Sequence, residues 1–135
     1  MLRIIIYEDK DTLRESLRLM LGSMDDIEVA AAFSNCNTVV EDMIQLQPEV
    51  VLMDIDMPGK NGIYGAEKIK EANPEISVIM HTVFDDDEKI FQSLEAGADG
   101  YLLKDTSPVI LYEAIQAVTL GSAPISPGVA KRVLQ

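Results

Sequence analysis

Short apolar runs and amphipathic helical patterns alternate five times along the chain. The apolar runs are rich in β-branched residues and show no polar alternation, which is typical of parallel strands buried on both faces. They cover residues 2–7, 28–33, 50–53, 76–81 and 100–103. Each run precedes a helical pattern that stops close to a Gly or Pro. These patterns predict helices over residues 12–21, 37–46, 64–72, 85–96 and 108–120.

This alternation predicts an α/β fold: a doubly wound, five-stranded parallel sheet in the flavodoxin-like order 2-1-3-4-5, with helices on both faces. A length of 135 residues suits one domain with a single core. The alternation ends after Gly121, and Pro124 and Pro127 follow. We therefore expect one domain over residues 1–121. Residues 122–135 are expected to be a linker that leads into a short helix from residue 128.

The charge of the chain restricts its partners. Asp and Glu number 23 against 11 Lys and Arg, so the formal net charge is −12. A surface of this sign repels nucleic acids and anionic membranes. We therefore expect neither direct nucleic acid contact nor membrane binding by this domain.

Single residues and short runs exclude other classes of protein. One cysteine, Cys36, cannot form an internal disulfide, and one histidine, His81, cannot build a multi-histidine zinc site. Both are expected to be core residues. The longest apolar runs fall far short of the ~20 residues that a membrane span needs. The N-terminus has no signal-peptide layout, so a cytoplasmic location is the simplest interpretation.

Acidic side chains follow two of the predicted strands. Glu8 and Asp9 follow the first strand, and Asp54 follows the third. These strands are neighbours in the order 2-1-3-4-5, and ligands of such sheets bind where their carboxyl ends meet. Grouped carboxylates repel one another unless a cation is present, and Mg²⁺ prefers oxygen ligands of this kind. The sequence therefore predicts a Mg²⁺ site, to which Asp56 would add a main-chain carbonyl or a further carboxylate.

A hydroxyl and an ammonium group are expected beside these acids. Thr82 ends the fourth strand, and Lys104 follows the fifth. Together with Mg²⁺, these groups suit the three oxygens of a phosphoryl group. A carboxylate can itself be the nucleophile that forms an acyl phosphate. Asp54 is the candidate for this phosphoacceptor.

The chain resembles the receiver domain of bacterial two-component response regulators. The resemblance extends over residues 2–121, with the motifs in the family's order and spacing: Glu8-Asp9, residues 53–59, Asn61-Gly62, Thr82 and residues 97–104. Residues 121–134 resemble the linker of the subfamily that carries a LuxR-type helix-turn-helix output domain. That output domain is absent here, and the resemblance implies that DNA binding belongs to it.

The resemblance implies a ligand set and a phosphoryl donor. Asp54 would accept a phosphoryl group from a sensor histidine kinase. Glu8, Asp9 and Asp54 would hold Mg²⁺ together with the Asp56 main-chain carbonyl. The Glu-Asp pair departs from the commoner Asp-Asp pair, which leaves the metal geometry open.

The resemblance also implies a conformational switch. Lys104 would contact the phosphoryl oxygens, and Thr82 would move to form a hydrogen bond with the phosphate. Tyr101 would turn inward behind Thr82. The domain would promote its own phosphorylation and slow dephosphorylation but turn over no external substrate, so it is not expected to be an enzyme.

Three alternatives remain open from the residues. Asp54 and Asp56 form an Asp-x-Asp pair, as in Mg²⁺-dependent phosphohydrolases of the haloacid dehalogenase type, although there the pair normally follows the first strand. A Mg²⁺ nucleic-acid enzyme fits poorly with the charge of −12. The helix expected over residues 108–120 is apolar over most of its circumference, which favours either a homodimer or an interdomain contact through it.

Overall fold

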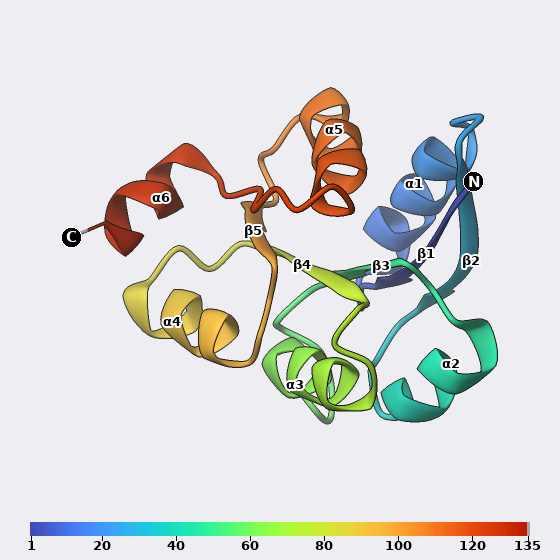
Figure 1. Ribbon diagram of the computed structural model, residues 1–135, viewed down its shortest axis with the longest axis horizontal. Helices are drawn as coiled ribbons and strands as arrows, with labels where there is room; N and C mark the ends of the chain where they lie inside the picture. Colours follow the sequence, from blue (N-terminus) through green and yellow to red (C-terminus); the bar gives the residue numbers. More distant parts are fainter. Residues whose placement is uncertain (135) are drawn as a thin grey trace.

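The computed structural model describes residues 1–134 and contains a five-stranded sheet in the order β2-β1-β3-β4-β5 (Figure 1). Every neighbouring pair of strands is parallel, which confirms the predicted flavodoxin-like α/β fold. The strands are β1 (Leu2–Tyr7), β2 (Ile27–Phe33), β3 (Val50–Met53), β4 (Ser77–Thr82) and β5 (Gly100–Leu103). The helices are α1 (Asp11–Gly22), α2 (Val39–Leu46), α3 (Gly62–Ala72), α4 (Asp87–Glu95), α5 (Pro108–Val118) and α6 (Pro127–Val133).

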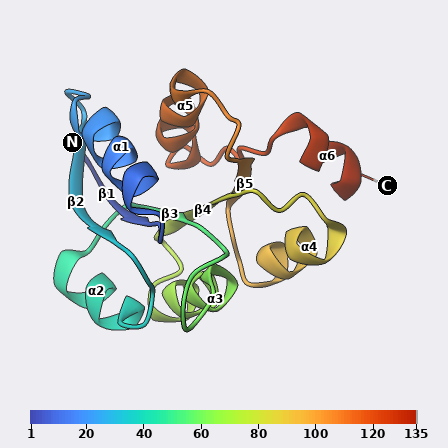
Figure 2. The ribbon, with the colours of Figure 1, turned by 180° about the vertical axis from the view of Figure 1, so that it is seen from behind.

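Helices cover both faces of the sheet. Figures 1 and 2 show α1 and α5 on one face and α2, α3 and α4 on the other. Alternate strand residues point to opposite faces, so the triplet at the centre of β1 is buried from both sides. Ile4 and Ile6 pack with α1 and α5, whereas Ile5 packs with α2 and α3. Full burial of one such side chain contributes about 1.5–3 kcal/mol, which holds β1 in the centre of the sheet.

Three helices begin two residues away from the predicted boundaries, and a side-chain cap accompanies two of them. α4 begins at Asp87 rather than at residue 85, because the Asp86 carboxylate accepts a hydrogen bond from the first helical turn. α3 begins at Gly62 rather than at residue 64, because Asn61 Oδ1 accepts one from Tyr64 N at 2.9 Å. The third, α2, begins at Val39 rather than at residue 37, and its N-cap residue Thr38 forms no side-chain cap bond. Within residues 1–134, no helix combines the length and apolar character that a membrane crossing requires.

The segment after α5 runs alongside β5. Ile125 forms a parallel bridge with Tyr101. The Tyr101 backbone N–H donates to the Pro124 carbonyl at 2.9 Å, and its carbonyl accepts from Ser126 N at 3.0 Å. These bonds attach the segment to the outer edge of the sheet, on the side of β5 that faces away from β4.

The last helix, α6, packs against α4, as both ribbon views show (Figures 1 and 2). Val129 is 1% exposed and belongs to the core cluster that also contains Tyr101. Arg132 Nη1 pairs with Asp87 Oδ1 at 3.0 Å. The role of residues 122–135 as a linker stays a prediction. Gln135, the end of that segment, lies outside the described residues.

Both residues that the sequence assigns to the core are buried. Cys36 is fully buried, and its thiol lies against the carbonyls of Lys60 and Asn61. His81, in β4, is 4% exposed. Burial, and then the nearby Lys104 charge, lower the pKa of His81 to about 4.

His81 is expected to make the protein less stable in acid. Its pKa is 6.5 in a model peptide and about 4 in the fold, so between these values the unfolded chain binds a proton that the folded chain excludes. The free energy of unfolding therefore falls as the pH drops from 6.5 to 4, by up to about 3 kcal/mol. Urea denaturation of wild type and His81→Gln at pH 7 and pH 4 measures this difference. Equal pH dependence of the two proteins would contradict the prediction.

Candidate functional site

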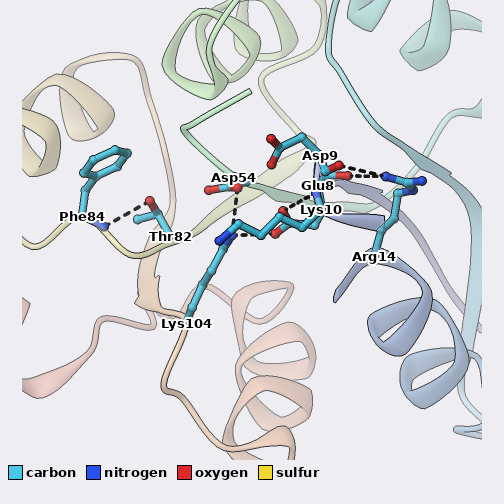
Figure 3. Close-up of polar contacts among 8 residues, drawn as sticks. All are labelled: Glu8, Asp9, Lys10, Arg14, Asp54, Thr82, Phe84 and Lys104. Atoms are coloured by element: carbon cyan, nitrogen blue, oxygen red, sulfur yellow. Dashed lines mark hydrogen bonds and ion pairs between the residues drawn. The ribbon is translucent and has the colours of Figure 1, made fainter. Parts of the chain in front are cut away.

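Three carboxylates meet at the carboxyl ends of β1 and β3. Glu8 and Asp9 follow β1, and Asp54 follows β3 (Figure 3). One carboxylate oxygen of each lies within 4.8 Å of the others. Glu8 is 1% and Asp54 3% exposed. The parallel pairing of Tyr7 with Met53 sets this arrangement, because the residues that follow them, Glu8 and Asp54, then lie side by side at the same edge of the sheet.

The Lys104 ammonium group bridges two of these acids. Its Nζ lies 2.8 Å from Glu8 Oε1 and 2.9 Å from Asp54 Oδ2 (Figure 3). Burial lowers the pKa of Lys104, but the two carboxylates outweigh this effect and raise it overall. Burial raises the pKa of Asp54 to about 6, opposed by the Lys104 hydrogen bond and reinforced by the Glu8 charge. The site therefore holds more negative charge than one ammonium group compensates.

A divalent cation fits the chemistry of this cluster. The buried Glu8 Oε1 has the Lys104 ammonium group 2.8 Å away as a cationic partner, and Asp54 shares that same group. One ammonium group cannot balance three carboxylates, and like charges at this separation repel. A hard cation with oxygen ligands would remove this repulsion. Asp56 has an exposed side chain that lies outside this cluster of described residues, and a contribution from its main-chain carbonyl stays a prediction.

Thr82 and Tyr101 lie on the neighbouring strands and share one partner, Phe84. The Thr82 hydroxyl accepts a hydrogen bond from Phe84 N at 3.3 Å (Figure 3). The Tyr101 hydroxyl donates to the Phe84 carbonyl at 2.6 Å. Tyr101 is fully buried, so its ring already lies in the inward position. The backbone also couples these strand ends, because Lys104 N donates to the Thr82 carbonyl at 2.9 Å.

The sequence pattern does not single out Phe84 or Arg14 as contributors to this site, and it includes Gly62 in a motif without giving it a role. Phe84 joins Thr82 to Tyr101, and its large apolar side chain after a strand end was the available signal. Gly62 packs directly behind Asp54, where a Cβ would lie 1.8 Å from the Asp54 carbonyl oxygen. Arg14 binds the backbone that carries Glu8, and nothing in the helical pattern of α1 distinguishes it.

The fold and the cluster together define a class of protein: a flavodoxin-like α/β domain with a candidate cation site at the switch point of its sheet. The chain belongs to the response regulator receiver domain family, whose family model matches residues 4–116. It is a signalling domain of two-component systems. This match does not support the haloacid dehalogenase alternative, and it indicates no enzyme family.

The chain is similar to regulatory proteins of two bacteria. The chain is 37% identical over 134 residues to the transcriptional regulatory protein LnrK of Bacillus subtilis, with 99% of the chain and 61% of LnrK covered. It is 32% identical over 127 residues to the oxygen regulatory protein NreC of Staphylococcus carnosus, with 93% and 58% covered. The chain thus spans about three fifths of the length of these relatives.

Solved structures agree with this assignment. A LuxR-family two-component response regulator from Aurantimonas sp. SI85-9A1 superposes with a TM-score of 0.92 at 25% identity, covering 99% of this chain and 96% of that one. The response regulator ChrA of a heme-sensing two-component system gives a TM-score of 0.81 at 34% identity, covering 99% and 64%. The chain is therefore similar to receiver domains of the LuxR type.

Proposed function

We propose that this receiver domain accepts a phosphoryl group on Asp54 from a sensor histidine kinase, in a Mg²⁺-dependent reaction, and changes conformation in response. One observation supports this most: the carboxylates of Glu8, Asp9 and Asp54 lie within 4.8 Å of one another, with the Lys104 ammonium group 2.9 Å from Asp54. A buried nucleophile, a cation site and a fixed positive charge are what phosphoryl transfer to a carboxylate needs.

The transfer makes one bond and breaks one. A carboxylate oxygen of Asp54 forms a bond to phosphorus as the phosphorus–nitrogen bond to the kinase imidazole breaks, and the imidazole leaves with the electron pair. Glu8, Asp9, Asp54 and the Asp56 carbonyl would hold Mg²⁺, which would supply positive charge to the phosphoryl oxygens. Lys104 then exchanges its contact with the Asp54 carboxylate for one with the phosphoryl group.

The switch passes through the shared partner of Thr82 and Tyr101. A new hydrogen bond from the Thr82 hydroxyl to the phosphate draws Thr82 toward Asp54 and alters its contact with Phe84 N. The Phe84 carbonyl accepts a hydrogen bond from the inward-facing Tyr101 hydroxyl. Movement of Phe84 therefore changes how often the Tyr101 side chain faces inward rather than outward. Tyr101 in turn packs with the segment that ends in α6.

The partners follow from this role. Val109 and Ile110 of α5 are 66% and 55% exposed, and Leu19 of α1, on the same face of the sheet, is 58% exposed. These apolar side chains favour a homodimer through α5. LnrK is a transcriptional regulatory protein, and the chain spans 61% of its length. We propose that the chain acts within a cytoplasmic transcriptional regulator, in which a separate output domain binds DNA.

Intact mass spectrometry with a small phosphoryl donor tests the proposal. Incubation of the chain with Mg²⁺ and acetyl phosphate is expected to give one added phosphoryl group, which hydroxylamine removes because acyl phosphates are labile to it. EDTA in place of Mg²⁺ is the control and should abolish the adduct. Steady hydrolysis of general phosphate esters without an accumulating adduct would contradict the proposal.

A further inference from the structure

Arg14, on the first turn of α1, reaches back to the backbone of the two acidic residues (Figure 3). Its Nη1 donates to the Glu8 carbonyl at 2.9 Å and, at the long limit of a hydrogen bond, to the Asp9 carbonyl at 3.5 Å. Its Nη2 pairs with Asp11 Oδ1 at 2.7 Å. The side chain is 22% exposed. One guanidinium group thus joins the end of β1 to the start of α1.

Other hydrogen bonds hold the backbone N–H groups of this turn. The Glu8 backbone N–H donates to the Phe33 carbonyl of β2 at 2.9 Å, and Lys10 N donates to Glu8 Oε2 at 3.1 Å. Lys10 is the N-cap residue of α1, and no side chain within residues 1–134 forms the usual cap bond there. Arg14 therefore anchors the carbonyls of a turn whose N–H groups lack the order that a capping side chain would add.

The turn between β1 and α1 carries two of the three carboxylates that repel one another. Glu8 and Asp9 stand beside Asp54, and repulsion among the three carboxylates favours an outward movement of the turn when no cation is bound. A planar guanidinium group with several fixed donors can hold two carbonyls and a carboxylate together, which a lysine ammonium group does less well. The Arg14 contacts thus oppose this movement without touching the carboxylates themselves.

We infer that Arg14 is a positioning residue for the cation site: it fixes the turn between β1 and α1 so that Glu8 and Asp9 face Asp54 before the cation arrives. This inference rests on the proposed Mg²⁺ binding at these acids. Partners that orient metal ligands from behind typically contribute 10–100-fold to metal affinity.

Arg14→Gln is compared with Arg18→Gln, a matched control one turn further along α1, where Arg18 pairs with Glu15 on the helix surface. Isothermal titration calorimetry measures Mg²⁺ affinity, and amide hydrogen exchange of the metal-free protein measures order in the turn. Arg14→Gln is expected to weaken Mg²⁺ binding by about tenfold and to speed exchange of the Asp9 and Lys10 amides. Arg18→Gln is expected to change neither quantity.

A second variant, Arg14→Lys, separates positioning from general stability, since it keeps the charge and the aliphatic stem. It should melt within a few degrees of wild type and still bind Mg²⁺ more weakly. If both Arg14 variants match Arg18→Gln in affinity and exchange while wild type binds Mg²⁺, the inference is wrong and the proposed function stands. If wild type neither binds Mg²⁺ nor forms the phosphoryl adduct, the proposed function itself fails.

Discussion

Replacement of Asp54 by asparagine is expected to abolish the phosphoryl adduct completely. The amide keeps the shape of the side chain but removes the nucleophilic carboxylate. The fold should persist, because burial already disfavours the charged form of Asp54 and raises its pKa to about 6. Intact mass spectrometry after incubation with acetyl phosphate and Mg²⁺ measures the adduct, and circular dichroism verifies the fold.

Asp25→Asn provides the matched control. Asp25 is exposed in the turn between α1 and β2, at the opposite end of the strands from the acidic cluster. This variant should form the same single adduct as wild type. A phosphoryl group that persists on the Asp54→Asn protein would place the acceptor elsewhere in the chain.

Replacement of Gly62 by alanine is expected to destabilise the fold by about 3 kcal/mol. The added Cβ would lie 1.8 Å from the Asp54 carbonyl oxygen and 2.9 Å from Ile55 Cα. Both are backbone atoms, so no side chain can rotate away to make room. Gly62 N also donates to the Ile55 carbonyl at 2.8 Å, which ties the start of α3 to this loop. Urea denaturation measures the loss.

Gly22→Ala is the control for this substitution. A Cβ at Gly22, the last residue of α1, would meet Val29 Cγ2 at 3.9 Å, an ordinary van der Waals distance. Its stability should stay within about 1 kcal/mol of wild type. A Gly62→Ala protein as stable as Gly22→Ala would mean that the loop behind Asp54 yields more easily than its backbone contacts indicate.

Much of this arrangement could be predicted from the sequence because it depends on topology. Five buried runs separated by helices leave few possible folds, and the strand order then places the residues after β1 and β3 side by side. The meeting of Glu8, Asp9 and Asp54 can therefore be predicted without knowledge of side-chain geometry. Lys104 reaches the same site from the end of β5. The functional roles of these residues stay predictions.

The other contacts of the site depend on loop paths and side-chain positions, which the periodicity of apolar residues does not predict. An amphipathic pattern says that Arg14 is polar, but only the folded turn brings its long side chain to the carbonyls of Glu8 and Asp9. The close approach of Gly62 to the Asp54 carbonyl depends on the path of the loop between β3 and α3. The docking of Val129 beside Tyr101 was also unforeseen, because the prolines around it read as a linker.

The segment that runs alongside β5 has a consequence for solubility. β5 is the last strand of the sheet, and a terminal strand with free N–H and carbonyl groups is a template for pairing with other chains. Pro124 and Ser126 occupy the Tyr101 backbone groups, and Ser126 Oγ accepts from Leu103 N at 3.0 Å. The protein thereby protects its own sheet from edge-to-edge aggregation. Any state that releases this segment exposes the edge of β5, including the backbone of Tyr101, to pairing with other chains.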